Sequence, residues 1–128
     1  MIKRGDLVWL KPEIEDINNL GENVQNIKRP FLVISNNKNN VHSPTIQIAA
    51  VSKKIRKSDY PMHVLLKKED YDCLRYDSIV LLEQVLTINK KFVQRKELSL
   101  SANDMKKVNK AIYIQMIDES LNIDTLIN

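Results

Sequence analysis

The sequence has few residues that could cross-link a fold. Cys73 is its only cysteine, and the two histidines, His42 and His63, lie far apart along the chain. One thiol cannot form an internal disulfide, and this set of residues does not supply the ligand cluster of a zinc site. A chain of 128 residues buries enough surface to fold without such cross-links. The sequence therefore predicts one compact domain that holds no metal and no cofactor.

Long apolar runs and aromatic residues are also scarce. Runs such as 79–82 fall far short of the roughly 18 apolar residues of a membrane span, and the first six residues lack the apolar stretch of a signal peptide. We therefore expect a cytoplasmic protein with no membrane partner. Aromatic residues make up 5% of the chain, too few for nucleic-acid recognition mainly by base stacking. The formal charge of +4 permits an anionic partner without requiring one.

Six short segments are rich in β-branched residues and are bounded by turn or charged residues, which is typical of strands. They span residues 6–10, 31–35, 45–52, 62–66, 78–82 and 85–88. Their close spacing leaves little room for long helices, so an antiparallel, barrel-like sheet is favoured over alternating strands and helices. Residues 67–74 could form one short helical turn.

One helix is indicated near the end of the chain. Ser101 can cap its first amides, and Asp104 places a negative charge near the positive end of the helix. Apolar residues then recur at steps of three and four, which predicts a stripe packed on the sheet with lysines facing outward. The stripe is Met105, Val108, Ala111, Ile112 and Met116, and the lysines are Lys106, Lys107 and Lys110. We expect a domain over residues 1–118, followed by a tail over 119–128 that is either a continued helix or an ordered extension.

Two loops have the composition of functional segments. Residues 11–28 are acidic, rich in asparagine and longer than most connections. The second loop directly follows the 45–52 strand and carries four cations in five residues, namely Lys53, Lys54, Arg56 and Lys57. Such a run is usually a solvated loop, but cations at a strand end can also contact the phosphates of a nucleic acid.

Several short motifs occur in a distinctive order between residues 2 and 117. They are Lys3-Arg4-Gly5-Asp6-Leu7-Val8-Trp9, Arg29-Pro30-Phe31-Leu32-Val33-Ile34-Ser35, Ser43-Pro44-Thr45 through Ser52, Pro61-Met62-His63-Val64, Asp77 through Gln84, and Thr87-Ile88-Asn89-Lys90. This order resembles the MazF/PemK toxins of bacterial toxin–antitoxin pairs. The resemblance implies a mainly β fold with a C-terminal helix, built as a small SH3-like antiparallel barrel of the PemK/CcdB type. It also implies a homodimer, metal-independent cleavage of single-stranded RNA, and inhibition by a cognate antitoxin protein.

The resemblance places Arg29 at the centre of the predicted chemistry. Metal-free cleavage of RNA needs a cation for the charged phosphorane, a proton acceptor for the attacking 2′-hydroxyl and a proton donor for the departing 5′-oxygen. A guanidinium can hold two phosphate oxygens, and its high pKa makes it a poor proton shuttle, so an electrostatic role is favoured. The alternative is a surface arginine paired with the acidic 11–28 loop.

Other residues complete the predicted site. Ser52, which stands where the family has threonine, can hold a phosphate oxygen or orient the 2′-hydroxyl, but it could equally be a turn residue. Glu83 can accept a proton or read a base edge, and Gln84 can bind base edges through its amide; both could instead be hydrogen-bonded residues at a strand end. Further RNA contacts are assigned to Lys53, Lys54, Arg56 and Asn26. His63 is interpreted as a core or interface residue.

Two other functions stay open at the level of sequence. CcdB-type gyrase poisons share the fold that the resemblance implies, and a fold alone does not separate them from nucleases. A catalytically silent homologue that only binds RNA or antitoxin is the other alternative, because the 21–28 loop departs from the family pattern. Leu86 and Asn89 also stand where the family has arginine and aspartate.

Overall fold

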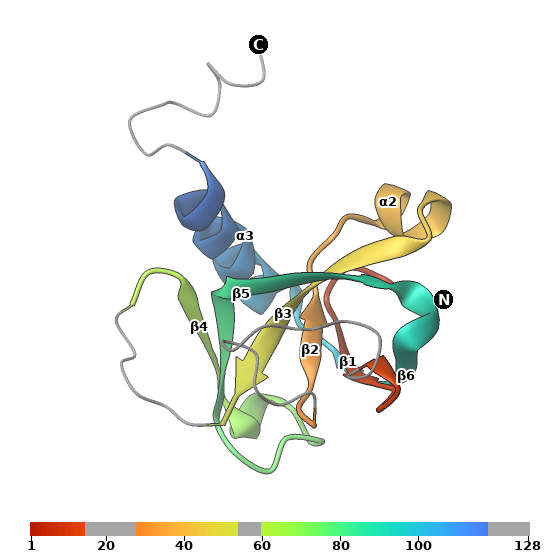
Figure 1. Ribbon diagram of the computed structural model, residues 1–128. Coiled ribbons are helices and arrows are strands. Elements are labelled where there is room, and N and C mark those ends of the chain that lie inside the picture. The colour runs from red at the N-terminus through yellow and green to blue at the C-terminus, as the bar shows by residue number, and fades with distance from the viewer. Residues whose placement is uncertain (15–27, 54–59, 118–128) are drawn as a thin grey trace.

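The computed structural model describes residues 1–14, 28–53 and 60–117 (Figure 1). Six strands form one antiparallel sheet in the order β4-β5-β3-β2-β1-β6. Their bounds are β1 Asp6–Leu10, β2 Phe31–Val33, β3 Thr45–Ser52, β4 His63–Leu66, β5 Ser78–Asn89 and β6 Val93–Ser99. The helices are α2 Asn37–His42 and α3 Ala102–Met116, with short 3₁₀ turns η1 Lys68–Asp70 and η2 Lys90–Phe92. The mainly β architecture with a C-terminal helix is the one expected.

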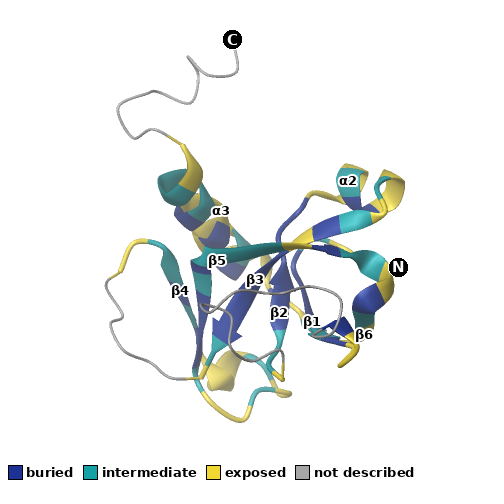
Figure 2. Cartoon of the chain, viewed as in Figure 1, coloured by how far each residue is buried: buried dark blue, intermediate teal, exposed yellow. Residues whose placement is uncertain are grey.

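The sheet separates two apolar clusters, because successive side chains of a strand point to opposite faces. Val51, Val64 and Val80 lie on the face that α3 covers, where they pack with Val108 of that helix. The opposite cluster contains Phe31, Ile48 and Ala50, among others. Figure 2 shows the resulting buried layer along the central strands. The alternation between the two clusters fixes the face on which each polar side chain of these strands lies.

Helix α3 begins as the sequence predicts. The hydroxyl of Ser101 accepts a hydrogen bond from the amide of Asp104 at 3.1 Å. Val108 and Ala111 are buried, and Lys106, Lys107 and Lys110 are exposed. The prediction was wrong for Met116, the last residue of the helix, which is 50% exposed. No helix in the described part of the chain is long and apolar enough to cross a membrane.

Two strands and one helix differ from the prediction. The segments 78–82 and 85–88 form one long strand, β5, because the polar pair Glu83-Gln84 interrupts the apolar pattern without interrupting the strand. Strand β6 was missed, since this edge strand is mostly polar and exposed. Helix α2 was missed as well, because its sequence NKNNVH lacks strong helix formers; the side chain of Asn36 caps it by accepting from the amide of Asn39. The short helical turn predicted within 67–74 is present as η1.

Candidate active site

Arg29 and Ser52 lie opposite one another at the end of the β2–β3 ladder. The two strands pair in antiparallel register up to Phe31 and Ala50, and the amide of Val51 donates to the carbonyl of Pro30 at 3.2 Å just beyond. Continuing this register by one further step places Arg29 opposite Ser52. Directly opposed residues of an antiparallel pair point to the same face, so the guanidinium and the hydroxyl project from one side of the sheet.

That side is the face that α3 does not cover. Val51 packs in the α3 cluster and Ala50 in the other one. Because side chains alternate along β3, Ser52 shares the face of Ala50. Both Arg29 and Ser52 are partly buried. None of the ion pairs among the described residues involves Arg29; most of the acidic loop proposed as its partner, residues 15–27, lies outside the described residues.

His63 joins the same face and was not predicted to be part of the site. It pairs with Leu81, which in turn pairs with Ala50 of β3. Its Nε2 lies 2.8 Å from Oε2 of Glu83, and the ring of Tyr60 packs edge-on against it with centroids 4.6 Å apart. The side chains of His63 and Glu83 are 17% and 30% exposed. His63 is thus a partly buried residue whose ring is held by a carboxylate, and its interpretation as a core or interface residue stays a prediction.

Glu83 and Gln84 lie in an irregular part of β5. Ala50 pairs with Leu81 but Ala49 pairs with Val85, so residues 82–84 have no partner on β3. Bulges of this kind re-aim side chains and are frequent beside active sites. Glu83 and Gln84 thus lie inside a strand, not at a strand end.

Three buried polar atoms near this bulge have no hydrogen-bond partner within the described residues. They are Nδ1 of His63, Oε1 of Glu83 and Oε1 of Gln84. Buried polar atoms are nearly always paired in folded proteins, and an unpaired one calls for an explanation. Their clustering on two adjacent strands indicates a place where a polar ligand can complete the hydrogen bonding.

The candidate site residues form two groups. Arg29 and Ser52 make up one, and His63, Glu83 and Gln84 make up the other. Ser52 pairs with Ile79, and Glu83 lies four residues further along β5. With a rise of about 3.3 Å per residue, the Cα atoms are roughly 10–13 Å apart along the strand direction. This separation leaves room for a bound nucleotide between the two groups of side chains.

The remaining predicted RNA contacts are only partly described. Lys53 directly follows Ser52, is exposed, and has its ammonium 5.4 Å from the ring centroid of Tyr76. Asn26, Lys54 and Arg56 lie outside the described residues. In the described part of the chain, no three or more His, Cys, Asp or Glu side chains are grouped so that they could hold a metal ion.

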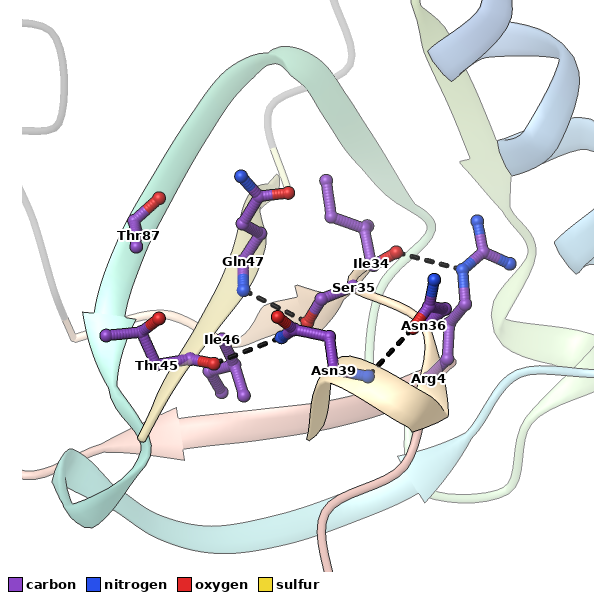
Figure 3. Close-up of a pocket in the computed structure, with 9 residues that line it drawn as sticks. All are labelled: Arg4, Ile34, Ser35, Asn36, Asn39, Thr45, Ile46, Gln47 and Thr87. Carbon is purple, nitrogen blue, oxygen red and sulfur yellow. Dashed lines mark hydrogen bonds between the residues drawn. The ribbon is translucent and has the colours of Figure 1, made fainter. Parts of the chain in front are cut away.

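A polar cavity of about 490 Å³ lies at the other end of β3 (Figure 3). Its walls come from the start of β3, the β2–α2 connection and the N-terminal turn. It is lined by Arg4, Ile34, Ser35, Asn36, Asn39, Thr45, Ile46, Gln47 and Thr87. Arg4 donates from Nε to the carbonyl of Ile34 at 2.9 Å, and burial lowers the pKa of this guanidinium. None of the predicted site residues lines this cavity.

Comparison with known proteins identifies the family of this chain. Residues 3–116 match the model of the "PemK-like, MazF-like toxin of type II toxin-antitoxin system" family. The chain is 36% identical over 116 residues to "Endoribonuclease MazF" of Staphylococcus saprophyticus subsp. saprophyticus, which covers 91% of this chain and 92% of that protein.

Solved structures share the fold at lower identity. One is described as "Endoribonuclease in complex with its cognate antitoxin from Mycobacterial species", with a TM-score of 0.70, 19% identity, and coverage of 91% of this chain and 95% of that one. Another is a MazE-MazF crystal structure from Deinococcus radiodurans, with a TM-score of 0.66, 18% identity and the same coverage. The match over residues 3–116 and the homology to endoribonuclease MazF show that this chain belongs to the PemK-like, MazF-like toxin family of type II toxin–antitoxin systems.

Proposed function

We propose that this protein is a toxin that cleaves single-stranded RNA without a metal ion, leaving 2′,3′-cyclic phosphate and 5′-hydroxyl ends. The observation that carries the proposal is the register of β2 and β3, which puts Arg29 opposite Ser52 on the face that α3 leaves uncovered. The homology to endoribonuclease MazF supports RNA as the substrate.

The reaction is an intramolecular transfer at phosphorus. The 2′-oxygen forms a bond to the phosphorus, the bond from phosphorus to the 5′-oxygen breaks, the 2′-hydroxyl loses its proton, and the departing 5′-oxygen gains one. Negative charge grows on the phosphorane oxygens as this happens. A fixed cation aimed at that charge is the largest single contribution a protein can make to such a step.

Each residue of the site has a part in this scheme. The guanidinium of Arg29 binds the two non-bridging oxygens of the scissile phosphate, and the hydroxyl of Ser52 donates to one of these oxygens or orients the 2′-hydroxyl. Glu83 and Gln84 bind the edge of an adjacent base, with His63 holding the Glu83 carboxylate 2.8 Å away. We assign the cleavage step to Arg29 and Ser52, and the reading of the base to Glu83 and Gln84.

The test is incubation of the purified protein with a long single-stranded RNA in EDTA, followed by mapping of both fragment ends. We expect discrete fragments with 5′-hydroxyl ends, and loss of cleavage in Arg29→Ala. Strict dependence on Mg²⁺, or 5′-phosphate ends, would contradict the mechanism.

A growth-arrest assay scored for RNA fragments and DNA breaks, together with an RNA-binding measurement, separates the alternatives. A gyrase poison would arrest growth with DNA breaks and intact RNA, and a silent homologue would bind RNA without cutting it. Membership of the PemK-like, MazF-like family supports cleavage of RNA over both.

The proposal includes a homodimer and an antitoxin partner. Strands β4 and β6 end the described sheet, and uncovered strand edges favour association with another chain. An antitoxin segment with acidic and apolar residues can cover Arg29 and Lys53 much as RNA does. Light scattering at micromolar concentration should give twice the mass of 14.9 kDa; a monomer mass would contradict the dimer.

A further inference from the structure

Tyr76 presents an aromatic ring to solvent just before β5 begins. The residue is 59% exposed, the largest exposed fraction of any aromatic residue described. The segment is anchored nonetheless, because the hydroxyl of the buried Ser78 donates to the carbonyl of Tyr76 at 3.1 Å. The ammonium of Lys53 lies 5.4 Å from the ring centroid. A ring held in place at its backbone and by a cation, yet open to solvent, has the properties of a binding platform.

The position of this ring relates it directly to the candidate active site. Ile79 pairs with Ser52, and Tyr76 lies three residues before Ile79. Glu83 lies four residues after Ile79 along the same strand, on the other side of the Ser52 row. Lys53 is the chain neighbour of Ser52. Lys53 and the ring of Tyr76 therefore lie next to Ser52 at the end of β3, and Glu83 lies further along β5 on the other side of the Ser52–Ile79 pair.

We propose that Tyr76 stacks on one unpaired base of the RNA, on the side of the scissile phosphate opposite to the base that Glu83 contacts, while Lys53 binds the phosphate beside that base. This inference rests on the proposed function, because it takes single-stranded RNA as the ligand. Unstacked bases of single-stranded RNA bind aromatic side chains through their π-faces, and every base has one. Tyr76 therefore holds the strand in place without selecting a sequence.

The chain has few other aromatic residues that could do this. Tyr60 is the only other aromatic residue among the described ones that is classed as exposed, and its ring packs against His63 at the far end of the site. A single platform is consistent with an aromatic content of 5%. Most of the binding energy then comes from phosphate contacts, and the stacked base holds the strand beside Arg29.

The test measures the affinity of the protein for a fluorescein-labelled 2′-O-methyl RNA of 20 random nucleotides, by fluorescence anisotropy. This probe lacks the 2′-hydroxyl nucleophile, so it is bound and not cut. Tyr76→Ala should weaken binding about 5- to 100-fold, as expected for loss of one stacked base. Tyr76→Phe should bind like the wild type, whereas Tyr76→Leu, which keeps apolar area but has no π-face, should resemble Tyr76→Ala.

An abasic strand of the same length is the control that distinguishes base stacking from a structural role of Tyr76. Its weak binding should be the same in the wild type and in Tyr76→Ala, because no base is present to stack. Equal weakening on both probes, or no weakening on either, would overturn the stacking role while leaving RNA cleavage by the wild type intact. A wild type that neither binds nor cuts RNA would overturn the proposed function and this inference together. Thermal unfolding of each variant checks that the exposed substitutions leave the fold unchanged.

Discussion

The Nε2 atom of His63 lies 2.8 Å from Oε2 of Glu83, and this contact joins β4 to the irregular part of β5. It holds a carboxylate on the face that also carries Arg29 and Ser52. The second oxygen of Glu83 is buried and has no partner among the described residues. The pair thus fixes the carboxylate and leaves one acceptor atom for a donor on a ligand, such as the amino group of a base.

This arrangement predicts that Glu83→Gln changes which RNA sequences are cut. An amide keeps the shape of the side chain but adds a donor where the carboxylate has only acceptors. The preferred base at one position should therefore relax or change, with each lost base contact altering discrimination by about 1–3 kcal/mol. Sequencing of fragment ends from a mixed RNA substrate measures this. A uniform loss of rate at all sites with unchanged preference would instead indicate proton transfer by Glu83.

His63 should act through Glu83, and a double-mutant cycle tests this. His63→Ala removes the group that positions the carboxylate, so it should relax the same base preference. The double variant should be no worse than the worse single variant, because residues in one hydrogen-bonded pair are not additive. Fully additive effects on discrimination would show that the two side chains contribute independently.

Arg29 is predicted to act on the rate and not on the fold. Arg29→Ala should lower kcat/KM at least ~10²-fold, the scale for removal of a preorganised charge at a transition state. Arg29→Lys keeps the charge but cannot hold two oxygens at once, so it should recover only part of the rate. Arg95→Ala is the matched control, since Arg95 is an exposed arginine on the edge strand β6, where it pairs with Glu97. Near-wild-type cleavage by Arg29→Ala would make Arg29 a structural residue.

Sequence reasoning supplied some parts of the candidate site more directly than others. Ser52 ends a strand that the β-branched pattern identifies, Arg29 lies two residues before another, and the family resemblance implied their roles. The contact between His63 and Glu83 was not predictable in this way, because alternation within a strand does not say which strands pair or in which register. The bulge at residues 82–84 was not predictable for the same reason, since it depends on how β5 pairs with β3.

The missed elements of the fold have local causes. Strand β6 has little apolar alternation because it lies at the edge of the sheet. Its backbone pairing with β1 holds it there. Helix α2 depends on asparagine side chains, including the buried Asn40, whose amide donates to the carbonyl of Ser35 at 2.9 Å. Such contacts are made by individual asparagine side chains, which a helix propensity scale does not describe.

Tyr71 should stabilise the fold in a pH-dependent manner. Its hydroxyl donates to Asp104 at 2.5 Å and accepts from the amide of Ser101 at 3.0 Å. Burial, followed by the hydrogen bond to Asp104, raises the pKa of Tyr71 above its ordinary value. The folded state therefore favours the neutral phenol. Its contribution is complete below the unfolded pKa of about 10 and is lost as the pH rises through the higher folded pKa.

Tyr71→Phe should accordingly lower the free energy of unfolding by about 1 kcal/mol at neutral pH, because it leaves two polar groups without this partner. The difference from the wild type should shrink as the pH rises above about 10. Urea unfolding at several pH values measures both quantities. A difference that stays constant across this range would show that ionisation of Tyr71 is not linked to folding. Tyr76→Phe is the control, because its exposed hydroxyl has no such partners among the described residues.

The last prediction concerns the cations that follow β3. If Lys53 and Lys54 contact phosphates, Lys53→Gln/Lys54→Gln should weaken RNA binding for all sequences and flatten its salt dependence by about 0.7 in logarithmic slope per lost contact. The preferred cleavage sequence should persist, because phosphate contacts position a strand while base contacts select it. Lys91→Gln is a matched control for Lys53, since the Lys91 ammonium also lies over an aromatic ring, 5.3 Å from the centroid of Phe92, but at the opposite end of β3. Binding isotherms at several salt concentrations should separate the two variants, and an unchanged slope in the double variant would mean that these lysines form a solvated loop with no part in binding RNA.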